Sequence, residues 1–260
     1  MMEKRFSLSF TGDTLSMLLP PNAFRRDYGN IIGLLKFRDI LNSIHSAQYA
    51  IDKAREVSNE ARNLELFYLT SAILDYNACY DYVNQIVFFC FNFGEEIKSK
   101  KNLEKQVRSV KSFFGEITRN KLSYKRDSLI ATNAIANTFF EKLEKFFNNR
   151  TKLSRWANCI KHHGGFATKE LLDQYDIASI ETSGGFSLSW AYQECPERQV
   201  VYDVLLTQNN IIVEYVNGLF IYIFKGSNVI GGKYEKPFVY QQISYPNDNV
   251  FITKLNTQEI

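Results

Sequence analysis

The sequence predicts an α+β fold, in which an N-terminal and central bundle of four to five α-helices precedes a C-terminal antiparallel β-rich region. Proline is the strongest helix breaker, and all five prolines lie before residue 22 or after residue 195. The long interval between them shows apolar residues at helical spacing. After residue 165, short β-branched and aromatic runs alternate with Asn-Asn and Asn-Gly dipeptides, a pattern typical of β-hairpins.

The helices are expected in the middle of the chain. The first spans residues 31–57, where apolar residues recur every three or four positions, as at Ile40 and Ile44. Further helices are expected over residues 60–97, 103–119, 128–147 and 151–163. Gly164 and Gly165 are expected to end the last of them, because glycine accepts the left-handed backbone that commonly closes a helix.

The second predicted helix contains the most apolar stretch of the chain, residues 64–93. This stretch also carries Asp75, Asp81 and Asn84, which would be costly in the hydrocarbon of a bilayer. We therefore expect a buried helix and no membrane partner.

Strands are expected in the C-terminal third. The candidate segments are residues 186–192, 199–206, 210–216, 219–224 and 238–243. The predicted organisation is then an N-terminal segment over residues 1–28, a helical bundle over 29–165 and the β-rich region over 166–260.

Composition narrows the function classes. The 31 basic and 28 acidic residues nearly cancel, so any binding to nucleic acid must come from a local patch. The four cysteines stand far apart without a CxxC pair, which makes a structural zinc site or a disulfide framework improbable. The first residues do not look like a signal peptide. We expect a cytoplasmic protein with buried thiols and with no metal or cofactor.

The candidate site lies on the helix predicted over residues 151–163, TKLSRWANCIKHH. At about 100° per residue, Arg155 and His162 point about 20° apart around the axis, with Asn158 about 60° from Arg155. Histidine exchanges protons near neutral pH, and arginine binds phosphate. Such a pair suits cleavage of RNA by its own 2′-hydroxyl, with histidine transferring the proton and arginine holding the developing charge, and no metal is required.

The segment RWANCIKH resembles the motif of HEPN domains, an arginine followed after four to six residues by a histidine near the end of the last long helix of a bundle. The resemblance covers the helical part only, roughly residues 29–165. It implies a metal-independent endoribonuclease with Arg155, Asn158 and His162 as catalytic residues. It also implies a homodimer that pairs two motifs, and a setting in toxin–antitoxin, abortive-infection or phage-defence systems with a possible antitoxin partner.

Further residues are predicted to support this site. Residues 98–126 are rich in lysine and arginine, which could follow an RNA backbone. The predicted RNA-binding residues are Lys161, His163, Lys121, Lys125 and Arg126. Asp75 needs a partner if it is buried, and one hypothesis is that it orients Arg155 or His162 across the bundle.

Three alternatives remain open. Arg38 and His45 match the same spacing on the first predicted helix, so the pattern also arises without function, and Arg155 and His162 could form a solvated or internally bonded helix surface. The bundle could be a non-catalytic module for dimerisation, RNA binding or partner binding. Lastly, the helical similarity could be coincidental, with a ligand pocket in the C-terminal sheet.

Overall fold

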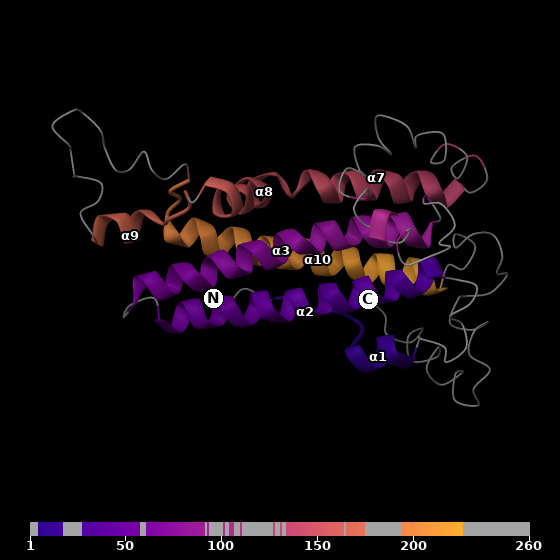
Figure 1. The fold of residues 1–260 in the computed structure, drawn as a ribbon, viewed down its shortest axis with the longest axis horizontal. Coiled ribbons are helices and arrows are strands. Elements are labelled where there is room, and N and C mark those ends of the chain that lie inside the picture. The colour runs from indigo at the N-terminus through magenta and orange to yellow at the C-terminus, as the bar shows by residue number, and fades with distance from the viewer. Residues whose placement is uncertain are drawn as a thin grey trace. The chain divides into compact units, whose positions relative to one another are not determined.

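The computed structural model is mainly helical in the part of the chain that it describes (Figure 1). The described residues are 5–17, 28–57, 61–91, 93, 101, 104–106, 110, 127, 131, 134–163, 165–174 and 194–225. The elements are α1 (Gly12–Met17), α2 (Tyr28–Val57), α3 (Arg62–Cys90), α7 (Ala134–Asn148), α8 (Thr151–Asn158), the π-helix η3 (Cys159–His163), α9 (Lys169–Gln174) and α10 (Arg198–Lys225). None of the helices in these ranges combines the length and apolarity needed to span a membrane.

The helices predicted for the middle of the chain are largely present. Residues 31–57 and 60–97 correspond to α2 and α3. The helix predicted over residues 128–147 corresponds to α7, and residues 151–163 form α8 and η3. The helix predicted over residues 103–119 lies mostly outside the described residues.

The predicted C-terminal β-rich region is wrong where the structure describes it. Residues 199–206, 210–216 and 219–224 were expected as three strands but form the single helix α10. Helices hold 86% of the described residues, and no strand occurs among them. Among the described residues, backbone pairing of the β type occurs at one isolated parallel bridge, between Phe166 and Glu194. The strands predicted over residues 186–192 and 238–243 lie outside the described part of the chain.

Helix α10 forms because its buried residues repeat at helical spacing despite a composition that favours strands. These buried residues are Val201, Tyr202, Leu205, Leu206, Gln208, Asn209, Ile212, Val213, Val216, Asn217, Leu219, Phe220 and Ile223. The predicted Asn-Asn turn falls inside the helix, where Asn209 is fully buried. The predicted Asn-Gly turn does so too, with Gly218 exposed and no atom within 4 Å of the position that a Cβ would take. Tertiary packing has overridden local turn and strand propensity.

The chain divides into two compact units, and the first comprises residues 1–7, 42–80 and 143–213. Its core contains hydrogen-bonded polar side chains among the apolar ones. The Asn209 Oδ1 atom accepts hydrogen bonds from Gln48 Nε2 at 2.9 Å and from the Tyr76 hydroxyl at 3.0 Å. The Asn209 amide donates to the Phe6 carbonyl at 3.3 Å. One side chain of α10 thus contacts α2, α3 and the N-terminal segment.

The second unit comprises residues 8–41, 81–142 and 214–260, and aromatic rings dominate its core. Phe10 stacks on Phe220 with ring centroids 4.5 Å apart, and Phe37 meets both rings edge-on. A second stack joins Phe139 to Tyr222 at 5.1 Å. These contacts between aromatic rings bury large apolar areas in preferred geometries.

In the second unit, α2 and α3 approach each other closely at Gly33. A Cβ built on Gly33 would overlap the buried sulfur atom of Cys90. The absence of a side chain at residue 33 is therefore what allows Cys90 to pack against the α2 backbone.

We predict that Gly33→Ala destabilises the protein by about 1–3 kcal/mol through overpacking, although alanine is the better helix former. Gly218→Ala is the matched control, because this exposed glycine in α10 has open space around it. That variant should gain about 0.5–1 kcal/mol. Urea denaturation followed by circular dichroism measures the free energy of unfolding of both variants. An equal increase in the two variants would contradict the close packing of Cys90 against Gly33.

Candidate functional site

Helix α8 presents the predicted site because its two faces differ in chemistry. Leu153, Trp156 and Ala157 are buried, and Cys159 continues this buried face into η3. The remaining positions carry polar side chains toward solvent. This amphipathic pattern fixes which side of the helix packs inward, so the exposed side is set by the sequence.

Arg150, directly before α8, ties the helix to α3. Its Nε donates to the Asn77 side-chain oxygen at 3.0 Å, and one terminal nitrogen donates to the Asn77 carbonyl at 3.2 Å. Its guanidinium also lies over the Tyr80 ring, 5.5 Å from the centroid. The sequence prediction missed this residue, because its partners Asn77 and Tyr80 lie about 70 positions away along the chain.

Four residues predicted for the site have exposed side chains on α8 and η3. They are Arg155, Asn158, Lys161 and His162. His163 is the last residue of η3. The predicted catalytic triplet and one predicted RNA-binding lysine are therefore all open to solvent on the same helical stretch.

The continuous α-helix expected over residues 151–163 is wrong after Asn158, because residues 159–163 form a π-helical turn. An i to i+5 hydrogen bond encloses one more residue than an α-helical turn, so each residue advances by less than about 100°. His162 therefore lies farther around the axis from Arg155 than the predicted 20° or so, and closer to the direction of Asn158. Turns of this type occur frequently at functional sites.

Glu194 is the charged partner of the exposed arginine. Its carboxylate forms an ion pair with Nε of Arg155 and accepts a hydrogen bond from the Trp156 indole at 3.3 Å. The Glu194 side chain is only 14% exposed, whereas that of Arg155 is 71% exposed. An anchored carboxylate thus meets an arginine that still faces solvent.

Backbone pairing places Glu194 beside α8. The Glu194 amide donates to the Gly165 carbonyl at 3.0 Å, and the Ala167 amide donates to the Glu194 carbonyl at 3.1 Å. The Trp156 ring packs on Phe166, with centroids 5.4 Å apart. The chain leaving η3 therefore holds the segment that supplies the carboxylate, and sequence spacing gave no signal for this contact.

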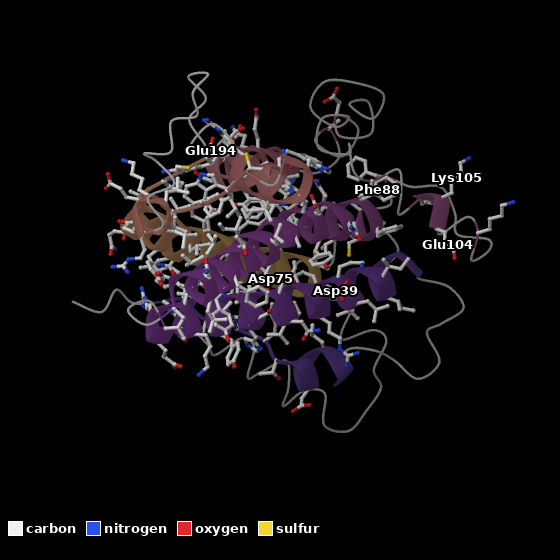
Figure 2. The ribbon with its side chains drawn as sticks, turned by 60° about the vertical axis from the view of Figure 1, so that its left-hand side comes forward. Asp39, Asp75, Phe88, Glu104, Lys105 and Glu194 are labelled. Carbon is white, nitrogen blue, oxygen red and sulfur yellow. The ribbon has the colours of Figure 1, made fainter. Side chains whose placement is uncertain are left out.

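Asp75 does not take the predicted role beside Arg155 or His162. Its half-buried carboxylate accepts a hydrogen bond from the Ser46 hydroxyl at 2.7 Å, between α3 and α2. Figure 2 shows Asp75 among the long helices and Glu194 beside α8, well apart in the view. Burial raises the pKa of Asp75, and the Ser46 hydrogen bond opposes that shift.

The structure does not place the other residues named from the sequence on this surface. Lys121, Lys125 and Arg126 lie outside the described residues. Arg38 and His45, the second match to the motif spacing, are exposed on α2. Within the described ranges, no three His, Cys, Asp or Glu side chains gather closely enough to hold a metal ion.

Comparison of the chain with protein-family models, with curated proteins and with solved structures finds no match in any of the three. The residues of α8 and η3 are therefore the only basis for a proposed function.

We predict that Arg150→Ala destabilises the protein by about 1–3 kcal/mol, because Asn77 loses charge-assisted hydrogen bonds in a partly buried place. Lys152→Ala is the control, since this exposed lysine contacts only the Trp156 ring face, 5.2 Å from its centroid, among the contacts described for it. It should cost no more than about 1 kcal/mol. Urea unfolding measured by tryptophan fluorescence compares the two, and equal losses would contradict the anchoring role of Arg150.

A second prediction concerns pH. Because the folded-state pKa of Asp75 is raised, its stabilising contribution is present below the unfolded pKa and is lost as the pH rises through the folded pKa. Asp75→Asn should therefore unfold at a higher urea concentration than wild type at neutral pH, and this advantage should shrink in acid. Asp203→Asn removes an exposed carboxylate of α10 as the control. The same pH-dependent gain in both variants would contradict the prediction.

Proposed function

We propose that this chain is a metal-independent endoribonuclease of HEPN type, with Arg155, Asn158 and His162 as its catalytic residues. The observation that carries the proposal is that these three side chains are all exposed on α8 and η3, opposite the buried face of α8. A reacting phosphodiester can reach such a surface from solvent.

Each residue has a role that fits its chemistry. His162 takes the proton from the 2′-hydroxyl or gives one to the leaving oxygen. Arg155 holds the phosphate as negative charge develops on it, and the products are a 2′,3′-cyclic phosphate and a 5′-hydroxyl. Asn158 donates a side-chain hydrogen bond to the phosphate or orients the imidazole, which the π-helical turn brings toward it.

The proposal includes the partners and the setting that the motif implies. Two copies would pair their motifs in a homodimer, which would enclose the exposed surface and exclude water from the reaction. Lys161 and His163 would contact the RNA backbone on either side of the phosphate that reacts. The protein would act in the cytoplasm as a toxin or an abortive-infection effector against phage, with an antitoxin as a possible restraint.

The second candidate function is a non-catalytic module that binds RNA or a protein partner. The ion pair between Arg155 and Glu194 favours it, because an arginine paired with a carboxylate on a helix surface also fits a structural contact that takes no part in chemistry. The two candidates differ in whether the same surface cleaves RNA or only holds it.

The decisive test is cleavage of a mixed RNA pool in excess EDTA. Wild-type protein should cleave and leave cyclic phosphate ends, whereas His162→Ala should lose about 100-fold or more in rate because the proton-transfer group is gone. Arg155→Ala should fall by a similar factor, because the charge that stabilises the transition state is removed.

His45→Ala is the matched control, since His45 is an exposed helical histidine of the second motif match. It should cleave like wild type. Loss of activity in that variant, or full activity in His162→Ala, would rule out the proposed site. A folded wild type that binds RNA without cleaving it would favour the binding module.

A further inference from the structure

We infer that Glu194 is a positioning residue for Arg155: it fixes the guanidinium so that its outer nitrogens face an incoming phosphate. This inference rests on the proposed function and adds to it a residue outside the RWANCIKH motif. Glu194 lies 39 positions after Arg155 in the sequence and meets it only through the fold.

The position of the Glu194 carboxylate is fixed by two sets of contacts other than the ion pair with Arg155. One oxygen accepts the Trp156 indole N–H at 3.3 Å, and the other pairs with Arg155 Nε. The backbone of Glu194 is bonded in both directions, to Gly165 and to Ala167. A carboxylate fixed in this way can restrict the long side chain of Arg155 before RNA binds. Less conformational entropy is then lost when RNA binds.

The atom that Glu194 engages leaves the phosphate-binding part of the guanidinium open. Arginine carries five N–H donors, and the ion pair with Glu194 is made at the Nε atom. The two terminal nitrogens carry the remaining donors and form the planar fork that binds phosphate bidentately. Since the Arg155 side chain is 71% exposed, this fork can meet a ligand from solvent.

The contact has little value as a stabilising ion pair by itself. Pairs with one solvent-exposed partner contribute little to folding, because water screens them and the side chain loses entropy. Its geometry is instead that of an orienting contact, in which a largely covered carboxylate holds an exposed cation on the proposed catalytic surface.

The test is a double-mutant cycle on RNA cleavage with the full-length protein. Glu194→Ala should lower kcat for cleavage about tenfold or more with a smaller change in KM, since a misplaced arginine stabilises the transition state less. Glu194→Gln keeps a hydrogen-bond acceptor and should recover part of this loss. In an Arg155→Ala background, Glu194→Ala should cause no further loss.

The control is Glu197→Ala, which removes an exposed carboxylate of the same segment that pairs with Lys169 instead. It should leave kcat unchanged. Additive losses from Glu194→Ala and Arg155→Ala, or an equal loss in Glu197→Ala, would overturn the inference.

A second readout separates failure of this inference from failure of the proposed function. Arg155 Nε–H of ¹⁵N-labelled protein, assigned by its loss in Arg155→Lys, should exchange with water slowly in wild type and faster in Glu194→Ala. Unchanged exchange would overturn the inference, whatever the activity. A second outcome would reject the proposed function. In it, exchange is faster in Glu194→Ala, but Arg155→Ala leaves both RNA cleavage and RNA binding unchanged. The positioning role would then be rejected as well.

Discussion

The buried amide of Asn209 is the contact on which the first unit depends. It joins α10 to Gln48 of α2, to Tyr76 of α3 and to the backbone of Phe6. A buried amide is costly unless its hydrogen bonds are made, so these partners define one register of α10 against its neighbours. The adjacent Gln208 extends the network by accepting from the Tyr80 hydroxyl at 2.7 Å and donating to the Asn149 carbonyl at 3.0 Å.

This network reaches the candidate site through the start of α8. Asn149 precedes Arg150, which bonds Asn77 and covers the Tyr80 ring. The beginning of α8 is therefore held by polar contacts from two different helices. Its far end is held by Trp156 and by the chain that returns at Glu194. The exposed side chains of α8 therefore project from a helix that is anchored at both of its ends, as proposed catalysis by positioning requires.

The sequence predicted the central helices well, because their apolar spacing is a direct physical consequence of burying one face. It also placed Arg155 and Asn158 within about 60° of each other on one helix, and both are exposed on α8. It failed at α10, where β-branched and aromatic residues indicated strands. Single-chain patterns do not reveal that Asn209 is a buried hydrogen-bonding centre and not a turn, because its partners lie more than 100 positions away along the chain.

The contact between Arg155 and Glu194 could not be predicted for the same reason, since it depends on a chain reversal that no local motif encodes. The π-helical turn also escaped prediction, yet it has a consequence for how this chain could vary. Because the turn holds one residue more than an α-helical turn, removal of one residue from 159–163 could be absorbed by rewinding it as α-helix. The flanking α8 and the Phe166–Glu194 bridge would keep their places. The turn thus gives the end of this helix a tolerance to length change that an α-helical end would lack.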